Sequence, residues 1–137
     1  MDARPIFDKY VIPALNSKKI IPNIDFLDKV FKELNKKNFS KFGSLYKGCI
    51  ATGDMFISDR EKINKLSREI KGLYAVEMEG AAFAQVAFQE KVNWLVIRTI
   101  SDEANENASS DFNDFLSDYQ FKSFDLIQRT INAMFVD

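Results

Sequence analysis

The sequence predicts an α/β fold with three layers, in which a parallel or mixed central sheet is flanked by helices on both faces. Two observations carry this prediction. Segments with apolar residues at helical spacing alternate along the chain with short apolar runs typical of strands. One of those runs, 94–100, is almost wholly apolar, as expected of a strand covered on both faces. With 137 residues, of which 46% are apolar, the chain is expected to form one globular domain at most, over 1–137.

The first half of the chain begins irregularly and then alternates between helix and strand. Three prolines within the first 22 residues predict an extended or looped start. Asn23 can cap the helix that follows, and Ser58 or Asp59 can cap the second helix, because their side chains accept hydrogen bonds from free backbone N–H groups. The expected elements are an irregular segment at 1–22, a helix at 24–35, a strand at 45–52 and a charged helix that ends at 70.

The second half continues the alternation and ends in a long helix. A short apolar run is followed by Gly80 and an alanine-rich helix, and the almost wholly apolar run comes next. A polar stretch at 101–110 is expected to be a loop, and the residues after it carry a broad apolar stripe at helical spacing. The expected elements are strands at 73–78 and 94–100 and helices at 80–91 and 112–134.

Charge and composition exclude several classes of function. The net charge is −1 and the charges are spread along the chain, so we expect neither nucleic acid nor an anionic membrane as a partner. The chain has no histidine, which removes serine–histidine–aspartate catalysis and argues against zinc, so we expect no metal and no cofactor. The single cysteine, Cys49, cannot form an internal disulfide, and no apolar run is long enough to span a membrane. We therefore expect a soluble cytoplasmic protein.

Polar and acidic residues follow three of the predicted strands. They are Thr52-Gly53-Asp54, Glu77-Met78-Glu79 and Ser101-Asp102. In open α/β sheets, ligands bind beyond the carboxyl ends of the strands, so these positions predict a binding site. A carboxylate at Glu77 or Glu79 can accept hydrogen bonds from two adjacent hydroxyls, as a ribose diol requires. The alternative is that these acids only favour a helix N-terminus, and that Asp102 only caps a turn.

Two motifs extend this interpretation to a family. They are Val76-Glu77-Met78-Glu79-Gly80-Ala81-Ala82 and, downstream, Arg98-Thr99-Ile100-Ser101-Asp102. Both resemble the nucleoside phosphorylase/nucleosidase superfamily, and specifically bacterial 5'-methylthioadenosine/S-adenosylhomocysteine nucleosidases. The resemblance implies the phosphorylase/hydrolase-like fold and hydrolysis of the N-glycosidic bond of adenine nucleosides, which releases adenine in methionine salvage. The implied substrates are 5'-methylthioadenosine, S-adenosylhomocysteine and, in a related branch, 6-amino-6-deoxyfutalosine.

The resemblance also implies roles in catalysis and ribose binding. Asp102 would be the acid that protonates the departing adenine, with Ser101 as a supporting hydroxyl. This role needs a raised pKa of Asp102, which partial burial at a strand end would supply. Glu79 would accept the ribose hydroxyls. Arg98 is expected to pair with a buried carboxylate in preference to contacting the substrate.

The remaining implied contacts surround the nucleoside. They are Glu77 and the backbone of Met78 at the sugar, Phe56 and the backbone of Ile57 at the adenine, and Phe112 at the hydrophobic side of the pocket. Each has a structural alternative. Glu77 could instead hold the fold together, the Phe56 segment could be a loop with apolar anchors, and Phe112 could belong to ordinary helix packing.

By this resemblance the chain corresponds only to the second half of the fold. The family's first half supplies the opening strands, a glycine-containing loop beside the sugar and the glutamate that activates the attacking water. We expect the chain alone to be inactive, and to associate as a homodimer or with the missing half. A hydrolase is favoured over a phosphorylase, because no arginine that could hold phosphate occurs between Arg98 and Arg129. The alternatives are a non-catalytic nucleoside-binding or oligomer-forming remnant, a relative of purine nucleoside phosphorylase, or an unrelated α/β domain.

Overall fold

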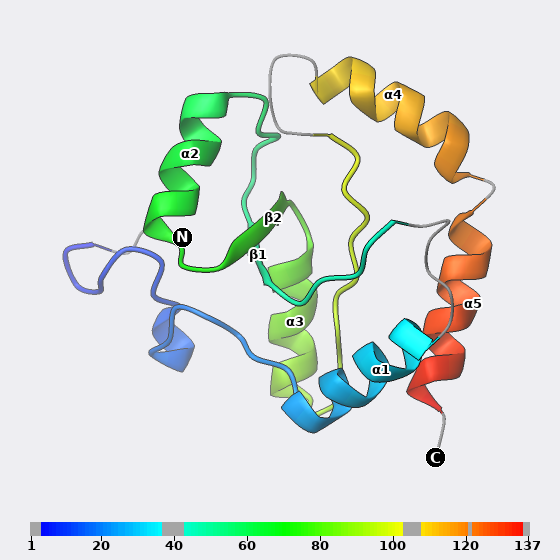
Figure 1. Cartoon of the computed structure of the whole chain (residues 1–137). Coiled ribbons are helices and arrows are strands. Elements are labelled where there is room, and N and C mark those ends of the chain that lie inside the picture. Colours follow the sequence, from blue (N-terminus) through cyan, green and yellow to red (C-terminus); the bar gives the residue numbers. More distant parts are fainter. Residues whose placement is uncertain (1–3, 37–42, 103–107, 121, 136–137) are drawn as a thin grey trace.

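A computed structural model describes residues 4–36, 43–102, 108–120 and 122–135. In this part of the chain, two strands form one parallel sheet with helices around it (Figure 1). The elements are, in chain order, a short 3₁₀ helix η1 (Pro13–Leu15), α1 (Ile24–Lys36), β1 (Cys49–Thr52), α2 (Arg60–Glu69), β2 (Leu73–Glu77), α3 (Gly80–Gln89), α4 (Ala108–Tyr119) and α5 (Ser123–Met134). The predicted α/β class is confirmed. Within the described ranges, no helix has the length and apolarity that a membrane crossing requires.

Two of the predicted helix starts are confirmed by hydrogen bonds. At the start of α1, Asn23 Oδ1 accepts from the backbone N–H of Phe26 at 2.9 Å. At the start of α2, Asp59 Oδ1 accepts from the N–H groups of Glu61 and Lys62 at 2.8 and 3.3 Å. Each side chain satisfies N–H groups that have no partner within the helix, so the local sequence sets where these two helices begin.

Strands β1 and β2 run parallel and end side by side. Their register places Thr52 opposite Glu77, and the N–H of Gly53 donates to the carbonyl of Glu77 at 2.9 Å. β1 is shorter than the strand predicted at 45–52, because its ladder with β2 begins only at Cys49, opposite Leu73. The carboxyl ends of both strands therefore bring their polar residues to the same edge of the sheet.

The buried core lies between α1 and α5, which pack against each other (Figure 1). Val30, Leu34 and Ala133 are fully buried there. The partly buried hydrophobic residues packed against them are Phe26, Leu45, Leu95, Ile97 and Met134. Two of these residues belong to the segment at 94–100, so apolar side chains hold that segment against the two helices.

The prediction of a strand at 94–100 is wrong, because the structure has no strand there. The segment forms a long open stretch in Figure 1 (yellow), and no backbone hydrogen bond joins it to any other described residue. A strand needs a partner for its N–H and C=O groups, and the described residues supply none. The predicted cover on both faces is also wrong, because the side of the segment that carries Ile100 leaves this residue 61% exposed.

The predicted terminal helix at 112–134 is in fact two helices, and the first of them begins inside the predicted loop at 101–110. The N–H of Lys122 bonds to the carbonyl of Tyr119 at 2.9 Å. This bond spans three residues and closes a tight turn, in place of the four-residue bond that would continue an α-helix. The break lets α5 pack on α1 while α4 runs in another direction (Figure 1).

Candidate active site

The ends of β1 and β2 form the centre of the candidate site. Because Thr52 and Glu77 are opposite each other in the ladder, their side chains meet, and the Thr52 hydroxyl donates to Glu77 Oε1. The same hydroxyl oxygen accepts from the N–H of Ala81 at 2.8 Å. Thr52 thereby joins the end of one strand to the end of its neighbour and to the first turn of α3.

The Glu77 carboxylate is almost enclosed, with 9% of its side chain exposed. Its oxygens accept from the N–H of Gly80 at 2.8 Å and from the N–H of Glu79 at 3.1 Å. A Cβ on Gly80 would lie only 3.0 Å from Glu77 Oε1, so glycine is the residue that permits this close approach. Glu77 therefore satisfies the N-terminus of α3, which is the structural alternative considered for this acid.

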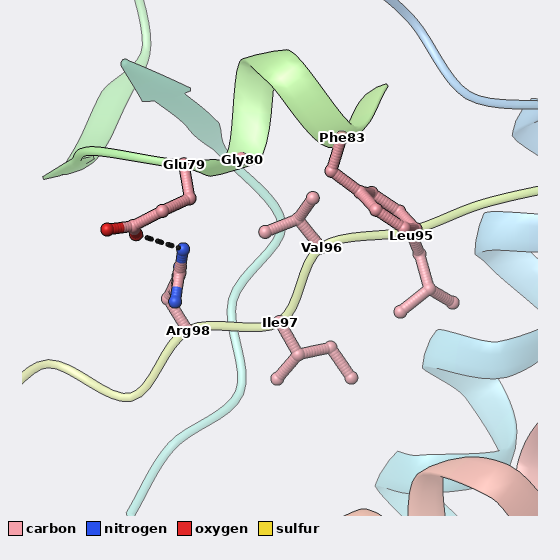
Figure 2. A pocket seen from close by; sticks show the side chains of 7 residues that line it. All are labelled: Glu79, Gly80, Phe83, Leu95, Val96, Ile97 and Arg98. Atoms are coloured by element: carbon pink, nitrogen blue, oxygen red, sulfur yellow. Dashed lines mark hydrogen bonds and ion pairs between the residues drawn. The ribbon is translucent and has the colours of Figure 1, made fainter. Parts of the chain in front are cut away.

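Arg98 connects this enclosed carboxylate to an exposed one. Its Nη2 pairs with Glu77 Oε2 and also with Glu79 Oε2, the second pair at 3.0 Å (Figure 2). The expectation that Arg98 pairs with a buried carboxylate is confirmed. Glu79 is the N-cap residue of α3 by position, yet its side chain makes no cap hydrogen bond and is 69% exposed. Glu79 is thus held from one side by Arg98 and is accessible from the other.

Opposing effects act on the ionisation of Glu77. Burial raises the pKa of its carboxyl, whereas hydrogen bonds from Thr52, from the backbone of Glu79 and Gly80, and from Arg98 lower it. The hydrogen bonds prevail together, and the pKa lies below the ordinary glutamate value of 4.5. Glu77 is therefore a permanently charged anchor at neutral pH and has no proton to donate there.

We expect Glu77→Gln to reduce the free energy of unfolding at pH 7 by about 1.5–3 kcal/mol, the usual worth of hydrogen bonds to a charged group. A folded-state pKa below the unfolded value contributes stability above about pH 4.5, and this contribution disappears as the pH falls through the folded-state value. Urea unfolding from pH 7 to pH 3 measures it. The difference in the free energy of unfolding between wild type and Glu77→Gln should decrease as the pH falls. The control Glu90→Gln changes an exposed residue that follows α3, and its free energy of unfolding should differ little from that of wild type. A difference independent of pH would contradict the assignment of Glu77 as a charged anchor.

The second acidic group follows the extended segment. Ser101 and Asp102 are both half-buried, and the Ser101 hydroxyl donates to Asp102 Oδ2 at 2.7 Å. They come three and four residues after Arg98, so one segment carries both the arginine that holds Glu79 and the predicted acid. Residues 103–107 lie outside the described part of the chain.

The side chains of the other predicted contacts are not joined to this network. Phe56 and Ile57 follow β1, with Phe56 49% exposed and Ile57 half-buried. Met78 is 46% exposed, between the two acids. Phe112 lies on α4 and is 41% exposed. No hydrogen bond or ring contact in the structure links Phe56 or Phe112 to another described side chain, so their placement against a base stays a prediction.

A shallow hollow lies beside Glu79, with a volume of about 260 Å³. We call it the Phe83 hollow; its lining residues are Glu79, Gly80, Phe83, Leu95, Val96, Ile97 and Arg98 (Figure 2). Of the predicted site residues it includes Glu79 alone, and neither Asp102 nor Phe56 lines it. The hollow therefore includes the carboxylate predicted at the ribose, but neither the predicted acid nor the predicted stacking residue.

Sequence reasoning missed one residue of this network. Thr52 was noted only as a polar strand end, although it makes two of the hydrogen bonds that connect β1, β2 and α3. The available signal was a threonine directly before Gly53, at the end of one predicted strand, together with the acidic residues at the end of the next predicted strand. Its partner depends on the register of β1 with β2, which the sequence did not specify.

The family of the chain follows from a comparison of its sequence. Residues 1–132 match the sequence profile of the phosphorylase superfamily, and the chain belongs to that superfamily. Among its relatives, a 5'-methylthioadenosine/S-adenosylhomocysteine nucleosidase of Bacillus licheniformis is 44% identical over 88 residues, which are 64% of this chain and 38% of the relative. The resemblance seen in the two motifs is confirmed.

Solved structures give the same result for the fold. The S-adenosylhomocysteine nucleosidase of Streptococcus pyogenes, in complex with 5-methylthiotubericidin, has a TM-score of 0.83 and 26% identity over 99% of this chain and 56% of its own. The 5'-methylthioadenosine/S-adenosylhomocysteine nucleosidase of Colwellia psychrerythraea, in complex with adenine, has a TM-score of 0.70 and 29% identity over 90% of this chain and 50% of its own. The chain thus spans about half the length of these solved relatives, and less of the curated one.

Proposed function

We propose that this chain supplies the ribose-binding and proton-donating part of an enzyme that hydrolyses the N-glycosidic bond of adenine nucleosides and releases adenine. The observation that carries the proposal is that the two neighbouring acids have different surroundings. Glu77 is enclosed and engaged, whereas Glu79 is exposed and oriented by Arg98. The relatives support the choice of ligand, because the solved enzymes bind adenine and 5-methylthiotubericidin.

Glu79 is proposed to bind the ribose. A carboxylate with two oxygens can accept hydrogen bonds from the 2'- and 3'-hydroxyls at once. Arg98 occupies one side of this carboxylate at 3.0 Å, so the exposed side remains for the diol. We assign Glu77 a positioning role through Arg98 and the α3 N-terminus, and Met78 a backbone contact with the sugar.

Asp102 is proposed to protonate the departing base. As the glycosidic bond breaks, the sugar becomes positively charged and the adenine accumulates negative charge, which a proton delivered towards N7 removes. Ser101 donates to one oxygen of Asp102 at 2.7 Å and so fixes the orientation of the carboxyl. The base would stack on Phe56, its edge would meet the backbone of Ile57, and Phe112 would close the apolar side.

The proposed substrates are 5'-methylthioadenosine and S-adenosylhomocysteine, with 6-amino-6-deoxyfutalosine as a third possibility in the same chemical class. We propose that the enzyme acts in methionine salvage. Its proposed location is the cytoplasm, and its proposed assembly is a homodimer. Water is favoured over phosphate as the attacking group, because the sequence offers no arginine between Arg98 and Arg129 to bind phosphate.

A chimera tests the proposal directly. In this chimera, the chain replaces the part of the Streptococcus pyogenes relative that it matches, so that the uncovered part of that enzyme is present too. The chimera should release adenine from 5'-methylthioadenosine, as followed by the change in ultraviolet absorbance. A folded chimera that binds adenine but releases none from any of the three nucleosides would favour the alternative of a non-catalytic binding protein.

Glu79→Gln in this chimera should weaken binding of ribonucleosides more than binding of their 2'-deoxy analogues. The expected difference is about 1.5–3 kcal/mol, because the substitution removes a charged acceptor from the 2'-hydroxyl. Calorimetric titration with non-hydrolysable ribo- and 2'-deoxyribo-analogues measures it, and Glu90→Gln serves as the control. Equal losses for the two sugars would remove Glu79 from the ribose site.

A further inference from the structure

Thr52 is the residue through which strand β1 acts on the two neighbouring acids. Its hydroxyl oxygen accepts a hydrogen bond from the N–H of Ala81 at 2.8 Å. Because that N–H occupies one side of the oxygen, the hydroxyl proton is directed to another side, where Glu77 Oε1 accepts it. The hydroxyl is thus acceptor and donor at once, and the first turn of α3 fixes the direction in which it donates.

The hydroxyl of Thr52 orients the Glu77 carboxylate. The N–H of Gly80 cannot do so alone, because it donates to Oε1 at 2.9 Å and to Oε2 at 2.8 Å and hardly distinguishes them. Thr52 binds Oε1, whereas Arg98 binds Oε2, as does the N–H of Glu79 at 3.1 Å. Burial raises the pKa of Glu77, and the hydrogen bond from Thr52 is the largest of the effects that lower it.

A chain of contacts leads from this hydroxyl to the exposed carboxylate of Glu79. Arg98 Nη2 pairs with Glu77 Oε2 and, at 3.0 Å, with Glu79 Oε2. Figure 2 shows the second of these pairs. One nitrogen therefore serves both acids, and its position depends on where the Glu77 carboxylate points. The hydroxyl of Thr52 bonds to Glu77 and Ala81, so its influence on Glu79 passes through Glu77 and Arg98.

We propose that Thr52 is a positioning residue for the ribose-binding carboxylate of Glu79. Its hydroxyl orients Glu77, and Glu77 in turn holds Arg98 at the place where it pairs with Glu79. One fixed side of the Glu79 carboxylate is then left for the 2'- and 3'-hydroxyls of a ribose. The inference rests on the proposed ribose contact of Glu79 and adds to it a residue of another strand, which the substrate does not touch.

Carbon-13 NMR of the glutamate side chains tests the positioning in this chain without any ligand. Thr52→Val keeps the branched shape and removes the hydroxyl, whereas Thr52→Ser keeps the hydroxyl. At pH 7 the carboxyl resonance of Glu79 should shift in Thr52→Val and return towards its wild-type position in Thr52→Ser. Thr130→Val is the matched control, because it removes a half-buried hydroxyl of α5 that bonds to a carbonyl at 2.9 Å. A shift of the Glu77 resonance without a shift of Glu79 would make Thr52 a purely structural link and would overturn the proposal.

Binding to the chimera measures the consequence for the sugar. The wild-type chimera should prefer a non-hydrolysable ribonucleoside to its 2'-deoxy analogue. This preference should fall about 3–10-fold in Thr52→Val, the effect of losing one hydrogen bond, and Thr52→Ser should restore it. Calorimetric titration measures both affinities, with Thr130→Val again as the control.

The two measurements separate this inference from the proposed function. If the preference falls in Glu79→Gln but not in Thr52→Val, the positioning role is overturned and the ribose contact of Glu79 stands. If the preference is unchanged in Glu79→Gln, the ribose contact is overturned, and the NMR comparison still decides whether Thr52 positions Glu79.

A crystal structure of the unmutated chimera with a bound nucleoside analogue tests the same contacts even if Thr52→Val does not fold. Thr52 Oγ1 should lie within hydrogen-bond distance of Glu77 Oε1, and Arg98 Nη2 within that distance of both carboxylates. Glu79 should at the same time accept hydrogen bonds from the ribose. An Arg98 that has left either carboxylate in this complex would overturn the proposal.

Discussion

Replacing Asp102 with asparagine in the chimera should lower kcat for 5'-methylthioadenosine by about 10²–10⁴-fold, the span that general acid catalysis contributes. Asparagine keeps the size of the side chain and can still accept a hydrogen bond from Ser101, but it cannot deliver a proton. Affinity for a non-hydrolysable analogue should change far less, because the proposed ribose contact at Glu79 and the proposed stacking surface of Phe56 remain. Single-turnover kinetics and calorimetry measure the two quantities separately.

A second substrate distinguishes proton donation from a structural role of Asp102. A nucleoside whose base departs without protonation needs no acid, so its hydrolysis should be much less sensitive to Asp102→Asn. Ser101→Ala serves as a companion variant. It removes the hydroxyl that orients the carboxyl of Asp102 but leaves the proposed proton donor itself in place. If Asp102→Asn slowed both substrates equally, Asp102 would be the cap of a strand end and not the leaving-group acid.

The second large effect concerns the chain by itself. Without the part of the fold that contains the family's water-activating glutamate, it should release adenine at least 10²-fold more slowly than the chimera does. The physical reason is that the chain holds the proposed acid for the base and the proposed carboxylate for the sugar, but no group assigned to activate water. Adenine release by equal concentrations of chain and chimera, at saturating 5'-methylthioadenosine, provides the comparison.

Two outcomes of that comparison are informative. Adding the uncovered part of the relative in trans should restore turnover, in a manner that depends on its concentration. Turnover by the chain alone at the rate of the chimera would show that the general base lies among these 137 residues. Glu79→Gln and Glu77→Gln would then be the first variants to test for its identity.

Local signals in the sequence were enough for much of the fold. Asn23 and Asp59 cap the helices that they were expected to cap, because capping involves only the next three residues. The prediction of a strand at 94–100 was wrong because strand formation is not local. It depends on a partner that can be remote in the sequence or on another polypeptide. The turn at Lys122 was not predicted, because the apolar stripe in the sequence continues across it. The two helices are distinguished by the packing of α5 against α1, which the stripe does not reveal.

The candidate site was predictable in composition but not in arrangement. The sequence places Glu77 and Glu79 two residues apart, and both were expected at the sugar. The structure gives them different surroundings, because Thr52 lies opposite Glu77 in the ladder and Gly80 admits its carboxylate to the start of α3. That difference depends on strand register and on one close approach, neither of which is a local property of the sequence.

The sharing of Arg98 between two carboxylates restricts how this part of the sequence can change over time. If Arg98 is replaced first, Glu77 keeps its hydrogen bonds to Thr52 and to the start of α3. It loses the arginine that pairs with a carboxylate only 9% exposed, which is costly for an enclosed charge. If Glu77 is replaced first, Arg98 still pairs with Glu79, and the loss falls mainly on the hydrogen bonds to Thr52 and to the start of α3. The effect of each replacement depends on the state of the other position, so the order of substitutions determines which variants lineages can reach.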